Sequence, residues 1–210
     1  MIQWFVQGGP VMYPLLLLSL LGVAIVVERL LVLREKTLLD PAQVAVLGEL
    51  LAARDYARAR EYCAEQSGPL PVLVATLLDN RTAPYDELKE LLEDTGRHQL
   101  RFLQRGLGAL ATVVAAAPLL GLLGTVLGMI QVFEAVSLAG AVRGEQLSAG
   151  IAQALITTAA GLIIAIPLLF LHAYLEGRAE GLAHAIEART LEFLHLVRRP
   201  PGGSGDSERA

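Results

Sequence analysis

Three apolar segments divide this 210-residue chain. The two longest, at residues 106–133 and 146–175, contain no charged residue over 28 and 30 positions. The third covers residues 11–33 and contains only Glu28 and Arg29 as charged positions. A membrane-spanning helix needs about 20 predominantly apolar residues, so each segment is long enough to cross a bilayer. The pattern predicts an all-α membrane protein with three transmembrane helices.

The distribution of basic residues predicts the orientation of these helices. Ten of the 17 Lys and Arg residues lie in 34–105 and five in 173–210, whereas only Arg143 lies between the second and third segments. Because cytoplasmic segments carry the excess of Lys and Arg, the N-terminus is expected outside and the C-terminus inside. A signal peptide has basic residues before its apolar stretch, but residues 1–10 contain no Lys or Arg. The first segment is therefore predicted to remain as a membrane helix.

The segments between the membrane helices carry helical signals of their own. Asp40-Pro41 is a helix start, Pro84 is followed by a second start, and an uninterrupted helix is expected from residue 85 to 136. The second and third membrane helices are both expected to extend into the cytoplasm. The predicted organisation is a periplasmic N-terminus (1–10), a first span (11–33), a cytoplasmic helical domain (34–105), a second span (106–136), a periplasmic loop (137–147), a third span (148–175), a cytoplasmic helix (176–198) and a disordered tail (199–210).

Composition narrows the possible functions. The chain is 54% hydrophobic but only 5% aromatic, and its formal net charge of −4 gives no basic patch for nucleic acid. Cys63 is the only cysteine, so the sequence predicts neither an intrachain disulfide nor a zinc cluster. No metal, cofactor or enzymatic activity is expected.

Small residues gather on one face of each long uncharged segment. At about 100° per residue, the second segment places Ala117, Pro118, Gly121, Gly124, Thr125 and Gly128 within one arc, and Gly124 and Gly128 form a GxxxG pair. Small faces let membrane helices approach closely, so plain helix packing is one interpretation of this pattern. The residues assigned to packing are Pro118, Gly121, Gly124, Gly128, Gly161 and Pro167.

The polar residues on these faces suggest the wall of a pore. Thr125 lies on the second segment, and Gln153, Thr157 and Thr158 lie on the third. If the chain turns near residue 142, Thr125 and Thr158 come to one depth near the middle of the membrane. Two helices cannot enclose a lumen, so a homo-oligomer is expected. Hydroxyls and amides cannot carry a proton, and neither segment contains an acid, so the carrier is expected on a partner helix.

The motifs AAPLLGLLGTVLGM at 116–129 and GIAQALITTAAGL at 150–162, with Ala165-Ile166-Pro167, resemble the two signature helices of the MotA/TolQ/ExbB proton-channel family. Three spans make the chain more similar to ExbB or TolQ than to MotA, which has four. The resemblance implies a pentamer in the bacterial inner membrane around an ExbD- or TolR-type partner, whose single helix carries an aspartate. It also implies coupling to a TonB- or TolA-type protein.

One position departs from the family pattern. Gln153 stands where ExbB and TolQ usually show glutamate, so a titrating role there is not expected. The function that the resemblance implies is an ExbB-like subunit energising TonB-dependent transport across the outer membrane. The alternatives are a TolQ-like cell-envelope subunit, a motility motor subunit, or a non-conducting scaffold whose small faces only pack. The residues leave open whether the ion is H⁺ or Na⁺.

Overall fold

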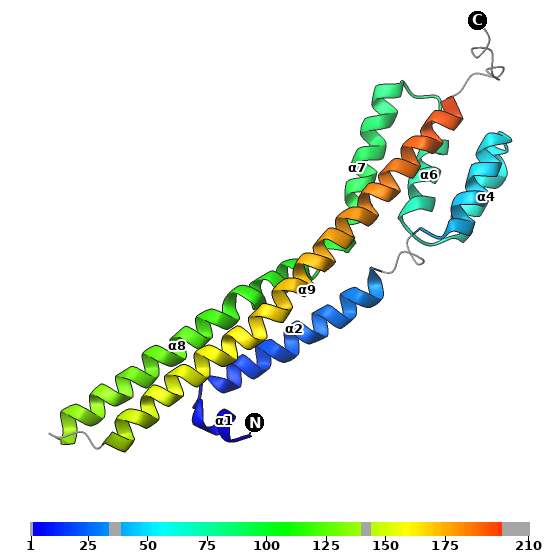
Figure 1. Cartoon of the computed structure of the whole chain (residues 1–210). Helices are drawn as coiled ribbons and strands as arrows, with labels where there is room; N and C mark the ends of the chain where they lie inside the picture. The colour runs from blue at the N-terminus through cyan, green and yellow to red at the C-terminus, as the bar shows by residue number, and fades with distance from the viewer. Residues whose placement is uncertain (1, 34–38, 140–143, 199–210) are drawn as a thin grey trace, which may run out of the picture. The chain divides into compact units, whose positions relative to one another are not determined.

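The described part of the chain is built from α-helices, three of which are long and apolar enough to cross a membrane. The computed structural model describes residues 2–33, 39–139 and 144–198. The three long helices are α2 (Met12–Val32), α8 (Leu107–Ala139) and α9 (Gly144–Arg198) (Figure 1). The prediction of an all-α chain with three membrane helices is confirmed. The chain divides into two compact units, a membrane unit (Met1–Leu31 and Gly106–Glu176) and a helical unit (Val32–Arg105 and Gly177–Ala210).

The membrane unit is held together by small and aliphatic side chains. It contains α1 (Ile2–Gln7), α2, α8 and the first part of α9. Its buried cluster joins α2 to both other long helices and consists of Val11, Leu15, Ala117 and Ala165. Gly22 of α2 is buried between Val113 of α8 and Leu168 of α9, so the lack of a side chain there brings the three helices together.

The described part of the helical unit contains four shorter helices and the end of α9. They are α4 (Pro41–Ala52), α5 (Tyr56–Glu65), α6 (Pro69–Asp79) and α7 (Tyr85–Gln104). The predicted start at Asp40-Pro41 is confirmed, because the Asp40 carboxylate accepts a hydrogen bond from the Ala42 amide at 2.9 Å. The start after Pro84 is confirmed too, with Asp86 and Glu87 in the first turn of α7.

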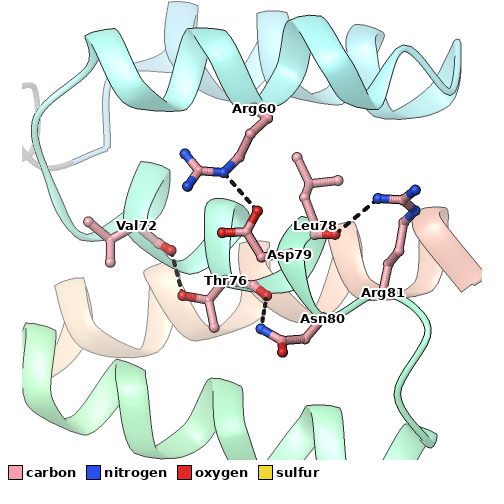
Figure 2. A network of polar contacts seen from close by, with 7 residues as sticks. All are labelled: Arg60, Val72, Thr76, Leu78, Asp79, Asn80 and Arg81. Carbon is pink, nitrogen blue, oxygen red and sulfur yellow. Dashed lines mark hydrogen bonds and ion pairs between the residues drawn. The ribbon is translucent and has the colours of Figure 1, made fainter.

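Polar contacts fix the end of α6 against α5. The Arg60 guanidinium of α5 pairs with the Asp79 carboxylate at 2.8 Å (Figure 2). Asn80 donates its side-chain amide to the Thr76 carbonyl at 2.9 Å, and Arg81 donates to the Leu78 carbonyl at 3.3 Å. These donors satisfy carbonyls that the end of a helix leaves without a partner.

Cys63 lies within α5 and is buried. Burial raises the pKa of its thiol to about 11, which leaves little reactive thiolate at neutral pH. In this environment Cys63 is an inert packing residue. The residues that the structure describes contain no group of three or more His, Cys, Asp or Glu side chains suited to a metal.

The predicted uninterrupted helix from residue 85 to 136 is wrong. α7 ends at Gln104 and α8 begins at Leu107. Between them Gly106 has a φ of 84°, a left-handed conformation that glycine adopts without a steric penalty. The Arg29 side chain packs against this glycine, with its Nε 3.4 Å from the position of a Cβ there.

The third helix, in contrast, runs without interruption, as predicted. α9 continues from Gly144 to Arg198 and contains Pro167 in its interior. The connection to α8 is shorter than the predicted loop at 137–147, because α8 extends to Ala139. The predicted tail at 199–210 lies outside the described residues, as do Arg34, Lys36 and Arg143.

Candidate functional site

Glycines hold α8 and α9 at backbone contact. A Cβ built on Gly161 of α9 would lie 2.6 Å from the Ala117 carbonyl oxygen of α8. A Cβ on Gly121 would lie 2.9 Å from the Thr157 carbonyl oxygen, and one on Gly128 would lie 3.0 Å from that of Gly150. These approaches leave no room for a side chain, so close packing depends on glycine at each position.

The same contacts define the register of this antiparallel pair. Gly128 faces Gly150 near one end, Gly121 faces Thr157 and Thr158 in the middle, and Ala117 faces Gly161 further along. The two helices lie side by side throughout this stretch (Figure 1).

Thr157 lies inside the helix pair. Its exposed fraction is 0%, and its side chain sits against Gly124. Its hydroxyl donates within its own helix, 2.9 Å from the Ala154 carbonyl and 3.1 Å from the Gln153 carbonyl. Thr157 therefore packs between the two helices of one protomer, and its place on the ion pathway stays a prediction. Thr157 and Thr158 are neighbours in the sequence, but adjacent side chains point about 100° apart around a helix. One of them can therefore be buried while the other is partly exposed.

Thr158 and Thr125 lie at the partly exposed edge of the pair. The Thr158 hydroxyl donates across the interface to the Gly121 carbonyl at 3.2 Å. The Thr125 hydroxyl donates to the Leu122 carbonyl of its own helix at 2.7 Å. Thr158 is therefore level with Gly121, and Thr125 lies four residues further along the same face of α8, roughly 6 Å away. The predicted common depth is wrong by about one helical turn.

The geometry of the two hydroxyls determines what they can bind. Each uses its proton on a backbone carbonyl, so each oxygen remains available as a hydrogen-bond acceptor. An acceptor of this kind stabilises a protonated carboxyl group or a water molecule, and favours the neutral form of an acid over its carboxylate. The edge lined by Thr125 and Thr158 is chemically suited to a protonated acid.

Gln153 contacts the N-terminal segment. It is half-buried, and its side-chain amide lies where a Cβ on Gly9 would be. Gly9 has a φ of 69°, a backbone conformation that favours glycine, and the nearby Gln153 amide leaves no room for a side chain. This contact was not predicted from the sequence, although Gly8-Gly9-Pro10 is a turn signal.

The two prolines assigned to packing differ in their environment. Pro118 of α8 is half-buried, whereas Pro167 of α9 is exposed. Membrane helices tolerate interior prolines because neighbouring groups can satisfy the freed carbonyls. The assigned glycines Gly121, Gly124, Gly128 and Gly161 are all buried, whereas the packing role of Pro167 stays a prediction.

The charged groups of the membrane unit lie near the ends of the apolar segments. Arg29 of α2 is 5% exposed and pairs with the Glu28 carboxylate at 2.7 Å. His172 of α9 has its Nδ1 3.8 Å from a Glu176 carboxylate oxygen. The described stretches 107–133 and 146–175 contain no carboxylate. The burial of Arg29 was not predicted from the sequence.

Together these features define a multi-pass helical membrane protein with a glycine-packed helix pair and a hydroxyl-bearing edge. The chain matches the model of the MotA/TolQ/ExbB proton channel family over residues 66–188 and belongs to that family. This range includes α6, α7, α8 and most of α9. The family assignment made from the two motifs is confirmed.

Individual relatives agree with this assignment. The chain is 37% identical over 174 residues to an ExbB-like biopolymer transport protein of Synechocystis, covering 77% of this chain and 65% of that protein. It is 33% identical over 172 residues to the biopolymer transport protein exbB1 of Vibrio cholerae, covering 77% and 72%. It is also 33% identical over 105 residues to the Tol-Pal system protein TolQ of Haemophilus influenzae, covering 50% and 46%. The chain spans about two thirds of the length of the Synechocystis relative.

Proposed function

We propose that this chain is an ExbB-like subunit of an inner-membrane stator complex that uses the proton-motive force to energise TonB-dependent transport across the outer membrane. The N-terminus and the α8–α9 connection lie on the periplasmic side, and the helical unit lies in the cytoplasm. The printed names of the Synechocystis and Vibrio relatives, both biopolymer transport proteins, support this direction.

The proposal rests on one observation: Thr125 and Thr158 line an edge of the helix pair, and no carboxylate lies within the stretches 107–133 and 146–175 of the same helices. Thr125 and Thr158 offer acceptor oxygens at a partly exposed edge of the helix pair. The chain's own membrane helices provide no acid for these oxygens to bind. A partner helix of the ExbD or TolR type, carrying one aspartate, supplies the titrating group, and several copies of this chain, expected to be five, surround it.

Protonation of the partner's aspartate is the step at which the two hydroxyls act. The neutral acid donates a hydrogen bond to a threonine oxygen, whereas the carboxylate needs hydrogen-bond donors that this edge does not provide. Each charge that crosses the membrane potential releases about 2.3 kcal/mol per 100 mV. Repeated protonation and release can therefore reorient the partner helix and perform work on a TonB- or TolA-type transducer.

A TolQ-like role in the cell envelope is the second candidate. It is favoured by the match to the Haemophilus TolQ protein, which covers 105 residues. The two roles share the same helix pair and the same proton chemistry. They differ in which transducer the complex engages.

Proton flux in a reconstituted complex tests the shared part of the proposal. The chain is co-purified with a single-helix partner encoded beside it, inserted into liposomes, and assayed for proton uptake under an imposed potential. We expect uptake to require both proteins and to disappear when the partner's membrane aspartate is replaced by asparagine. Uptake by the chain alone, or uptake that survives the asparagine replacement, would refute the proposed division of roles.

A further inference from the structure

A cluster of basic side chains marks the last turns of α7. His98, Arg101 and Arg105 recur at helical spacing and are all exposed. Together with Phe102 and Gln104 they line an open depression of about 550 Å³ in the helical unit. The depression therefore combines positive groups, an amide donor and an aromatic ring.

The positive charge of this cluster is not compensated locally. The sequence contains no Asp or Glu between Asp94 and Glu134. Within residues 2–33, 39–139 and 144–198, Arg101 and Arg105 form no ion pair within 4 Å, whereas Arg58 and Arg189 each pair with an acid. The two guanidinium groups are thus available to an external anion.

The place of the cluster in the chain indicates which anion is near. Arg105 and Gly106 alone separate α7 from Leu107, the first residue of a membrane-spanning helix. A basic group this close to a span is held near the lipid headgroups, and juxtamembrane basic residues are attracted to anionic lipids. The half-buried Phe102 adds an apolar surface that suits the glycerol or upper acyl region of a lipid.

We propose that His98, Arg101, Gln104 and Arg105, with Phe102, form a binding site for the headgroup of an anionic phospholipid. The planar guanidinium groups can each donate two hydrogen bonds to a phosphate, which a diffuse positive surface does not do. This site is separate from the hydroxyl edge of α8 and α9, and its occupancy does not require ion conduction.

Relative lipid association measures this site directly. The full-length protein is reconstituted with its partner in phosphatidylcholine, and spin-labelled phosphatidylglycerol and phosphatidylcholine are compared by electron paramagnetic resonance. We expect a preference for phosphatidylglycerol that falls about five-fold for each arginine removed by Arg101→Gln and Arg105→Gln. The lysine pair Arg101→Lys and Arg105→Lys retains the charge and should keep part of the preference.

A matched control removes two exposed arginines elsewhere in the same unit, Arg58→Gln and Arg189→Gln, and should leave the preference unchanged. An equal loss in this control would mean that net charge alone attracts the lipid, and no preference in the wild type would also overturn the site. Inorganic phosphate at millimolar concentration should not abolish the preference. If it does, the cluster binds free anions and the assignment to lipid is wrong. Because no flux is measured, any of these failures leaves the proposed stator function untouched.

Discussion

Proton uptake by the reconstituted complex should fall about five- to ten-fold when Thr158 is replaced by valine. Valine has nearly the same shape as threonine but has no hydroxyl. In the wild type this hydroxyl donates to the Gly121 carbonyl, and its oxygen is available as an acceptor for the partner's acid. One hydrogen bond to a protonated acid contributes about 1–1.5 kcal/mol, which corresponds to about a five- to ten-fold change in rate. The measurement is the initial rate of proton uptake at matched protein content.

Thr158→Ser is the control for this change, because it restores the hydroxyl and loses only a methyl group. We expect the serine variant to conduct at near wild-type rates, and Thr125→Val to behave like Thr158→Val. The amount of assembled complex should be the same in all four proteins. Full conduction by both valine variants would show that the hydroxyls serve only packing.

Replacing Gly124 by valine should destabilise the α8–α9 pair by about 1–3 kcal/mol, and more if the helices must separate. A Cβ at Gly124 would overlap the Thr157 side chain, which is itself completely buried. The expected result is a lower thermal midpoint in detergent and a smaller yield of oligomer. Both are read from size-exclusion chromatography after a series of heating steps.

Gly108→Val provides the comparison on the same helix. A Cβ at Gly108 meets nothing within 4 Å, so this variant carries the same change in helix propensity without the overlap. We expect its thermal midpoint to stay close to that of the wild type. If both variants lose stability equally, the effect belongs to valine in the helix and not to the contact with Thr157.

The sequence predicted most of the architecture because the strongest signals are local. Uncharged runs defined the spans, and Asp40 and Pro84 marked helix starts that the structure contains. The break at Gly106 was not predicted because membrane helices tolerate glycine. A single glycine in an apolar segment therefore does not indicate a left-handed backbone conformation. Its packing against Arg29 is a tertiary contact that no local pattern contains.

The candidate site was predicted in composition but not in register. The small faces of the two segments identified the residues that meet, including Gly121, Gly128 and Gly161. Their pairing depends on where the chain turns between α8 and α9. The position predicted for the connection was a few residues off, so Thr125 and Thr158 lie about one helical turn apart and not at the same level. The same periodicity could not decide whether Thr157 faces the neighbouring helix or a lumen.

The central claim is that the edge bearing Thr125 and Thr158 faces water within the assembled complex, and thiol accessibility tests it most directly. Single cysteines are introduced at Thr125, Thr158, Thr157 and Leu155 in a Cys63→Ala background, which removes the native thiol. A water-soluble methanethiosulfonate reacts with thiolate, which forms in water and not in lipid. Leu155 is 65% exposed on the apolar outside of α9, whereas Thr157 is 0% exposed.

We predict that Thr125→Cys and Thr158→Cys react at least about ten-fold faster than Leu155→Cys and Thr157→Cys, since suppressed ionisation slows a thiol in proportion to its thiolate fraction. The rates are measured on the complex with its partner in liposomes. Slow reaction at both threonine positions, with Leu155→Cys the fastest of the four, would contradict the account and place this edge against lipid.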